Sequence, residues 1–303
     1  MIGYKFVYVI LHFNTIQDTV ECVKSIKDKL GSENQEIVIV DNGSPNGSGK
    51  EIERLFGNEK GIHIILNDKN LGFARGNNVG FRYAKYDLKA DYIVLLNSDT
   101  KILNSNMQQM VIEEYEESHC GVIGPKIKTP NPSVNVNPGP AKMPLMKEEL
   151  REMAVLAFYW TLSFFDLDEK FHNRFGKKTK KRMKSISETQ DGPRQYNVQL
   201  HGSFMVFTPS YIEKFDGLCD KTFLYCEEEI LYVRCMKAGL KTAYIPSFVI
   251  FHKEDSSTDS LKFGKPAKKR RFVYRHCLKG KMVLIGQLFR TPKSQLPDAD
   301  QKL

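Results

Sequence analysis

Two acidic sites, far apart in the sequence, have the residue types that metal binding and proton transfer require. Asp99 stands in the sequence NSDT, directly after the apolar run Tyr92–Leu96. An aspartate at the end of a parallel strand can hold a hard divalent cation, which in turn neutralises phosphate oxygens. Glu227–Glu229 follow the aromatic run FLYC. They could simply complement the dipole of a helix start, but burial beside aromatic rings would raise the pKa of one carboxyl group and suit it to take a proton from a hydroxyl.

Two polar loops contain groups suited to a nucleotide. Asp41 begins the sequence DNGSPNGS, where a carboxylate could bind a ribose, although these residue types also form ordinary turns. The sequence NDKNLGFARGNN, from Asn67, opens a predicted helix. Free amide groups there would favour a diphosphate, with Arg75 assisting, unless the segment is only a helix cap. The chain contains neither GxGxxG nor GxxxxGKS/T, so loops for dinucleotides and ATP lose their main support.

His252 is a further candidate ligand. It follows the apolar run Ile245–Phe251 and precedes Asp255–Ser257. A histidine at the end of an apolar run is more often structural than a ligand, but its place after a predicted strand keeps metal binding open as an alternative.

The apolar runs that precede these residues predict a parallel α/β sheet. In the N-terminal half, short β-branched runs alternate with helically spaced segments, as in βαβ units. Strands are predicted at Phe6–Leu11, Glu36–Val40, Ile62–Leu66 and Tyr92–Leu96, and helices at Thr19–Leu30, Gly49–Phe56 and Ala74–Tyr86. Ligands of such sheets bind outside the carboxyl ends of the strands, so we expect the candidate residues to gather at one edge.

Composition divides the rest of the chain. Met146–Arg182 predicts an apolar helical stretch that passes into a lysine-rich tail, and Tyr196–Phe251 a second ordered block. From Lys265, basic residues mixed with apolar ones predict an amphipathic interfacial helix. The expected organisation is one domain over residues 1–264, with a variable helical insertion at 145–195, and a basic amphipathic tail at 265–303.

The bulk composition narrows the class of protein. The 303 residues are 41% hydrophobic and 27% charged, which excludes a disordered or membrane-embedded chain. The six cysteines lack metal-ligand spacing, so packed thiols are expected. No basic segment precedes the apolar run Phe6–Phe13, so we expect a cytoplasmic protein without a secretory signal. The net charge of +9 suits nucleic acid, an anionic membrane or phosphate-bearing substrates, and does not choose among them.

Taken in order, these motifs resemble the family 2 glycosyltransferases of the GT-A fold, especially the rhamnosyltransferase-like branch of bacterial polysaccharide assembly. The motifs are HFNT at His12–Thr15, VDNGSPNGS, NLGFARGNN, LLNSDT, HGSFMVF at His201–Phe207, FLYCEEEIL and HKEDSS. The resemblance extends from Tyr8 to about Ser257 and is weak over Met146–Gln195. It implies an α/β, mostly parallel sheet flanked by helices, with a helical insertion and a helical C-terminal tail.

The resemblance implies donor-binding roles for several matching residues. Phe13, Asn14 and Asp41 would line the pocket for the base and ribose. Asn70–Gly72 and Arg75 would lie beside the donor. In the same way, the donor sugar and acceptor site would be shaped by Gly202 and Ser203.

It also implies the residues of the chemical step. Asp99 would bind Mg²⁺ or Mn²⁺, with His252 completing the metal site. Asn97 stands where the family's DXD-like motif has its first carboxylate, so ribose contact there would use an amide. The family's general base is the second acid of an ED pair, which aligns with Glu228, and Glu227 is the adjacent candidate.

The function expected from the resemblance is inverting transfer of a sugar, rhamnose or a hexose, in bacterial surface polysaccharide synthesis. The donor would be a nucleotide-diphosphate sugar, UDP- or dTDP-linked, and the acceptor a glycan or a lipid-linked glycan. A sugar nucleotidyltransferase is one alternative, but HFNT stands where its basic triphosphate loop should follow the first strand.

A non-catalytic module for RNA or anionic lipid is the other alternative. The lysines of residues 177–184 lack interleaved aromatic residues, so nucleic acid is not expected as a partner. The C-terminal tract has aromatic residues, and we expect it to contact the cytoplasmic face of the membrane.

Overall fold

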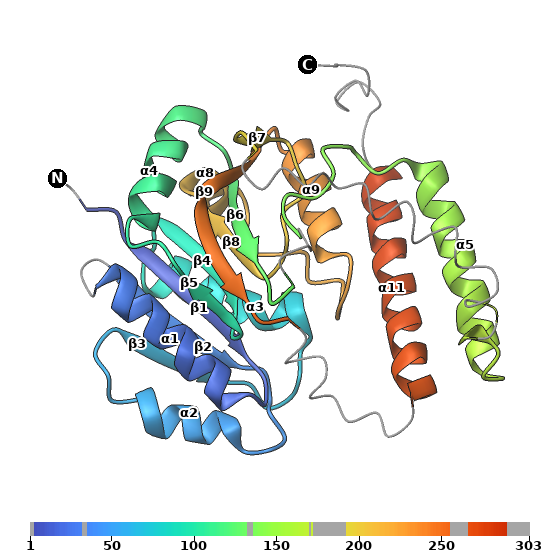
Figure 1. The fold of residues 1–303 in the computed structure, drawn as a ribbon, viewed down its shortest axis with the longest axis horizontal. Coiled ribbons are helices and arrows are strands. Elements are labelled where there is room, and N and C mark those ends of the chain that lie inside the picture. The colour runs from blue at the N-terminus through green and yellow to red at the C-terminus, as the bar shows by residue number, and fades with distance from the viewer. Residues whose placement is uncertain are drawn as a thin grey trace.

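A nine-stranded β-sheet with helices on both faces forms the centre of the protein (Figure 1). The computed structural model describes residues 3–31, 35–131, 136–169, 171, 192–254 and 266–289. The strands are β1 Phe6–His12, β2 Gln35–Asp41, β3 Ile62–Leu66, β4 Tyr92–Asn97, β5 Thr100–Ile102, β6 Val122–Lys128, β7 Gln195–Tyr196, β8 Phe204–Phe207 and β9 Thr242–His252. The helices are α1 Ile16–Leu30, α2 Ser48–Phe56, α3 Phe73–Arg82, continued by the π-helical turn η1 Tyr83–Asp87, α4 Met107–Ser118, α5 Met146–Ser163, α8 Pro209–Lys214, α9 Glu227–Lys237 and α11 Pro266–Phe289.

The first four strands pair in parallel, as the sequence predicted. The order along the sheet is β3-β2-β1-β4-β8-β6-β9-β5, with β7 on the side of β9. Strands β1 to β4 are joined by the helical crossovers α1, α2 and α3 with η1. The ends of these four strands agree with the predicted bounds to within one or two residues. The second half is mixed, because β8 runs antiparallel between β4 and β6 while β6 and β9 are parallel. The predicted α/β fold is therefore confirmed, and its parallel part is the N-terminal half.

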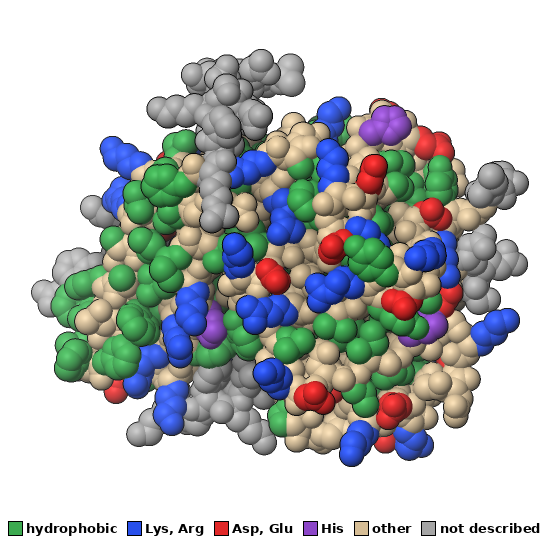
Figure 2. All heavy atoms as spheres, turned by 180° about the vertical axis from the view of Figure 1, so that it is seen from behind, with side chains coloured by type: hydrophobic (Ala, Val, Ile, Leu, Met, Phe, Trp, Pro, Cys, Tyr) green, Lys and Arg blue, Asp and Glu red, His purple; other side chains and the backbone are tan. Residues whose placement is uncertain are grey.

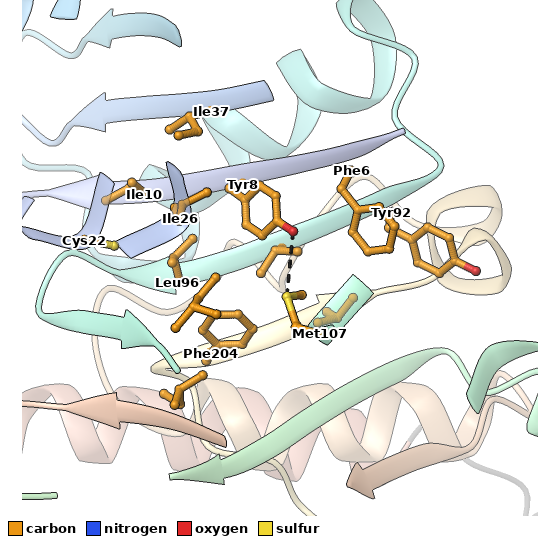
Figure 3. Close-up of a cluster of buried hydrophobic side chains, with 14 of the residues drawn as sticks. Phe6, Tyr8, Ile10, Cys22, Ile26, Ile37, Tyr92, Leu96, Met107 and Phe204 are labelled. Carbon is orange, nitrogen blue, oxygen red and sulfur yellow. Dashed lines mark hydrogen bonds between the residues drawn. The ribbon is translucent and has the colours of Figure 1, made fainter. Parts of the chain in front are cut away.

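Successive side chains of the buried strands point to opposite faces of the sheet, so each face has its own hydrophobic core. Tyr8 of β1 points into the face covered by α1, α2 and α4, where its hydroxyl lies 3.7 Å from the sulfur of Met107 (Figure 3). Val9, its neighbour, points to the opposite face, covered by α3, α8 and α9. Helix α3 approaches that face closely because Gly80 has no side chain: a Cβ there would lie 2.3 Å from Val9 Cγ1. Both faces of the sheet are buried, so residues that point to either face are apolar, and the apolar runs in the sequence are uninterrupted.

Helices α5 and α11 form an antiparallel pair beside the sheet, with α9 between α11 and the strands (Figure 1). Their contacts join Lys281 with Glu149, Tyr274 with Tyr159, and Arg270 with Asp168. The predicted C-terminal helix therefore exists, and part of its apolar side packs against the protein. Leu284 is fully buried in a small cluster with Ile230 and Val233 of α9. No helix in the described residues is both long and apolar enough to cross a bilayer.

The predicted helical stretch Met146–Arg182 agrees with the structure over its first half, where α5 ends at Ser163. The lysine-rich residues 177–184 and the segment Asp255–Ser257 lie outside the described residues. So do residues 290–303 of the expected tail.

Candidate functional site

The loops that follow β1 and β2 are held together by buried polar contacts. His12, at the end of β1, is fully buried, and its two ring nitrogens lie 2.7 Å from the Thr19 hydroxyl and 2.8 Å from the Ser48 hydroxyl. Burial lowers the pKa of His12, although the Asp41 carboxylate 4.0 Å away opposes this shift. His12 therefore joins the first strand to the starts of α1 and α2, and it also lies close to Asp41.

Asp41 itself is buried at the end of β2. Its carboxylate accepts hydrogen bonds from the backbone amide and the hydroxyl of Ser44. Ser44 in turn accepts a 2.9 Å hydrogen bond from the amide of Asn14, which has a left-handed backbone with φ of 65°. Phe13 is half-buried next to it. The structure thus brings together the three residues predicted to line the base and ribose pocket.

The loop after β3 contacts the same group through Asn42. Its side-chain oxygen accepts from the amide of Leu71 at 3.0 Å, and its nitrogen donates to the carbonyl of Gly72 at 3.2 Å. The Asn70 side chain accepts from the amide of Gly72 at 2.8 Å. The amide of Phe73 donates to the carbonyl of Phe223 at 2.7 Å. Free amide donors were expected at the start of α3, and at these three positions the amides are already used within the protein.

Arg75 lies on the exposed side of α3 and turns toward a different segment. Its Nε donates to the carbonyl of Asp220 at 2.7 Å. In this structure Arg75 therefore connects α3 to the segment that precedes α9.

Asp99 and His252 meet where β5 pairs with β9. Thr100 lies opposite His252 in this pairing, and the His252 Nε2 is 3.2 Å from the Asp99 Oδ1. The Lys253 amide donates to the Asp99 carbonyl at 3.1 Å, which fixes the two chain segments to each other. Both side chains are buried, and the Nδ1 of His252 has no hydrogen-bond partner among the residues that the structure describes.

The donor set of this pair fits a divalent cation in part. A carboxylate and an imidazole are suitable ligands for Mn²⁺, and the carboxylate also suits Mg²⁺. Across the described stretches of the chain, however, no three Asp, Glu, His or Cys side chains form a group that could hold a metal by themselves. A cation bound by Asp99 and His252 would need further oxygen ligands from outside the protein.

The residues that lead into β8 lie next to the Asp99–His252 pair. The Asn97 amide donates to the Ser203 carbonyl at 2.9 Å, so the ends of β4 and β8 are joined. The His201 ring lies 5.8 Å from the His252 ring, measured between centroids. The Nδ1 of His201 accepts a 3.2 Å hydrogen bond from the Ser203 amide, which places the ring proton on Nε2.

His201 connects this pair to the acidic segment. Its Nε2 is 3.9 Å from Glu228 Oε1, and the same oxygen accepts a 2.7 Å hydrogen bond from the amide of Gly202. Burial lowers the pKa of His201 and the carboxylate of Glu228 opposes the shift, so the ring is neutral at neutral pH. Asp99, His252, His201 and Glu228 therefore form a continuous row of side chains. Sequence reasoning gave His201 no role, although it begins the HGSFMVF motif.

The three adjacent glutamates have different surroundings. Glu227 is buried, and burial raises its pKa to about 7. Glu228 is half-exposed and faces His201 and Gly202. Glu229 lies 3.1 Å from the Nζ of Lys281 on α11. Of the three, Glu228 is the one that lies near His201, whose ring in turn lies beside His252.

Comparison with known proteins identifies the family of the chain. The sequence profile described as Glycosyl transferase family 2 matches residues 8–185, more than half of the chain. The chain belongs to this family. Glycosyltransferase GlyG of Streptococcus pneumoniae serotype 4 is 29% identical over 111 residues, which cover 37% of this chain and 35% of GlyG. The low-salt glycan biosynthesis hexosyltransferase Agl10 of Haloferax volcanii is 24% identical over 193 residues, covering 64% of this chain and 50% of Agl10.

Among solved structures, this family 2 glycosyltransferase is similar to residues 1–349 of S. aureus TarS. The TM-score is 0.51 at 13% identity, and the match covers 82% of this chain and 60% of that one. A second TarS structure, in complex with UDP-GlcNAc, gives the same TM-score of 0.51. These matches show a shared GT-A fold. The chain spans half or less of the curated relatives it matches.

Proposed function

We propose that this family 2 glycosyltransferase is an inverting, metal-assisted enzyme that transfers a sugar from a nucleotide-diphosphate donor to a glycan or a lipid-linked glycan. The observation that supports this most is the row formed by Asp99, His252, His201 and Glu228. This row supports the proposal because Asp99 and Glu228, the proposed metal ligand and the proposed general base, lie at its two ends. A buried structural ion pair would not require a half-exposed carboxylate at the other end of the row.

The proposed roles of the residues combine what the family resemblance implies with the contacts described above. Asp99 and His252 would hold Mg²⁺ or Mn²⁺, with diphosphate oxygens as further ligands, and the bound cation would neutralise the leaving nucleoside diphosphate. Glu228 accepts the proton of the acceptor hydroxyl as that oxygen attacks the anomeric carbon. The Gly202 amide keeps the Glu228 carboxylate oriented. One displacement without a second nucleophile inverts the configuration at the anomeric carbon.

The proposal also concerns which nucleotide sugar is the donor. Agl10 is named a hexosyltransferase, and TarS has been solved with UDP-GlcNAc. These names favour a UDP-linked hexose, whereas the motif resemblance favours dTDP-linked rhamnose, for a role in bacterial surface polysaccharide synthesis. Asp41, held by Ser44, is placed to bind the ribose that is common to UDP-linked donors.

A panel of UDP-, dTDP- and GDP-sugars tests this function. With Mn²⁺, one nucleotide class is expected to raise the melting temperature and to be hydrolysed slowly without acceptor, and both effects should disappear with EDTA. Magnesium at millimolar concentration is the second arm of the experiment. If no nucleotide sugar shifts the melting temperature under either metal, the transferase proposal is wrong.

We also propose that the pair of helices α5 and α11 rests on the cytoplasmic face of an anionic membrane. Near the end of α5 and just after it, Phe158, Phe164 and Phe165 are 52%, 54% and 71% exposed. The antiparallel packing puts the basic first half of α11, with exposed Lys268 and Arg275, beside these rings. Figure 2 shows apolar side chains next to a band of lysine and arginine on this side of the protein. Aromatic residues that enter the interface and cations that attract anionic headgroups are the two features of a peripheral membrane surface.

Vesicle flotation tests the membrane contact. Replacing Phe158, Phe164 and Phe165 together with serine should lower binding to phosphatidylcholine vesicles that contain phosphatidylglycerol at least tenfold, because the inserted rings are lost. Leu55→Ser with Tyr86→Ser, two exposed apolar residues on other helical segments, is the control and should bind normally. Equal flotation of the wild-type and triple-serine proteins would reject this surface. Binding that is equally strong with and without phosphatidylglycerol would reject the role of α11.

A further inference from the structure

The turn that presents Glu228 has an unfavourable backbone. Tyr225 and Cys226, just before α9, both have left-handed conformations, with φ of 75° and 67°. Residues with a Cβ adopt this region rarely, and two in succession persist only where the surroundings hold them. Cys226 is also the N-cap of α9, and its carbonyl accepts the first helical hydrogen bond from Ile230 at 3.0 Å. The direction of the Glu228 side chain therefore depends on whatever fixes this turn.

Helix α3 holds the segment from one side. The carbonyl of Phe223 accepts the hydrogen bond from the Phe73 amide. Gly72 makes the close approach possible: its φ is 85°, and a Cβ there would lie 2.3 Å from that carbonyl oxygen. The Phe73 ring also lies within reach of Gly202, 3.6 Å from the position of a Cβ on that glycine. Phe73 thus links the segment that leads into the turn to the loop that carries the hydrogen-bond donor to Glu228.

Helix α11 holds the segment from the other side. Gly280 faces the turn directly, and a Cβ there would lie 2.8 Å from the Tyr225 carbonyl oxygen and 2.9 Å from the Cys226 sulfur. One turn earlier in α11, the His276 ring packs on Phe223 with 4.9 Å between centroids. The backbone of α11 itself, and not only its side chains, packs against Tyr225 and Cys226.

Lys281 fixes the position of α11 against both neighbouring helices. Its buried ammonium group lies 2.7 Å from Glu149 and 3.0 Å from Glu152 on α5, and 3.1 Å from Glu229 on α9. Burial alone would lower the pKa of Lys281, but the surrounding carboxylates raise it, so the ammonium stays charged. Glu229 is the residue next to Glu228, so this ion-pair group holds the start of α9 as well.

We propose that α11 is a positioning element for the general base: Gly280, His276 and Lys281 hold the left-handed turn in the conformation that keeps Glu228 on the Gly202 amide and beside His201. The helix that sequence analysis interpreted as a membrane tail thereby becomes part of the active-site support. The catalytic consequence rests on the proposed function, but the structural link between α11 and the Gly202 amide does not.

Two glycines of the same helix provide a matched test. Gly280→Ala inserts a methyl group against the turn, whereas Gly286→Ala, six residues later, meets no atom within 4 Å. Both changes favour the helix equally, so they differ only in what the methyl group contacts. We expect Gly280→Ala to lower kcat at least tenfold with an unchanged donor Kd, and Gly286→Ala to behave as wild type.

A second readout does not need turnover. In protein labelled with ¹⁵N-glycine, the Gly202 amide resonance should shift, and its hydrogen exchange should accelerate, in Gly280→Ala but not in Gly286→Ala. If the Gly202 amide changes in Gly280→Ala but the wild-type protein transfers no sugar, the positioning role of α11 stands and the proposed function is rejected. An unchanged amide, with or without loss of kcat, overturns the positioning role. If Gly280→Ala does not fold, His276→Ala replaces it, with at least a threefold loss of kcat and the same amide shift expected, and an unchanged amide again overturns the proposal.

Discussion

Glu228→Gln is expected to lower kcat by 10²–10⁴-fold, on the order expected for removal of a general base, while the donor Kd stays within about twofold. The amide of glutamine can still accept the hydrogen bond from Gly202, so the loop geometry is kept. It cannot take a proton from the acceptor hydroxyl. Steady-state kinetics with saturating donor, together with calorimetric titration of the donor, separate the two effects.

Glu227→Gln makes the same chemical change one residue earlier and is the comparison for this prediction. Burial holds the Glu227 pKa near 7, and the side chain is 9% exposed, so an acceptor has little access to it. We expect Glu227→Gln to lose less than about tenfold in kcat, in contrast to a lost general base. Normal turnover in Glu228→Gln together with a large loss in Glu227→Gln would assign the base to Glu227 instead.

Asp99→Ala is expected to remove the metal-dependent part of donor binding and to lower kcat/KM on the order of 10²–10³-fold, as loss of electrostatic stabilisation of a leaving group does. Asp99 supplies the only carboxylate of the Asp99–His252 pair, and its 3.2 Å contact with His252 would be lost as well. Thermal shift with UDP, measured with Mn²⁺ and with EDTA, should show a difference in the wild type that is absent in the variant.

Asp216→Ala is the control for this change. Asp216 pairs with Lys85 at 2.6 Å, beyond the C-terminal end of α3, so its removal also breaks an ion pair of an aspartate. It should leave the response to Mn²⁺ intact. A full Mn²⁺ response in Asp99→Ala would place the cation at another site or remove it from the reaction.

The sequence was sufficient for the parallel half of the fold. Strands such as Phe6–His12 are buried on both faces, so their apolar runs are continuous and easily recognised. Strand β8 has only the four residues Phe204–Phe207. Its antiparallel place depends on pairing with β4, more than 100 positions earlier in the chain, and with β6, more than 80 positions earlier. Local patterns contain no information about such pairing, so the mixed half was not predicted.

Local patterns also could not separate the three glutamates or place α11. Successive residues of a helix point about 100° apart, so each of Glu227–Glu229 meets a different environment. The basic and apolar residues of α11 predicted an interfacial helix, but they could not show that Leu284 packs against α9, because that contact appears only once the helices are packed. His201 was missed for the same reason: its importance comes from lying between His252 and Glu228 in space.

The central position of β8 affects how the polypeptide can fold as it is synthesised. Ile93 of β4 pairs with Phe207 of β8, so β4 keeps an open edge of unpaired amide and carbonyl groups until more than a hundred further residues have left the ribosome. Contacts of such long range slow folding and leave intermediates that are prone to aggregate. The nascent N-terminal half would therefore depend on chaperones or on fast elongation until its last neighbour strand arrives.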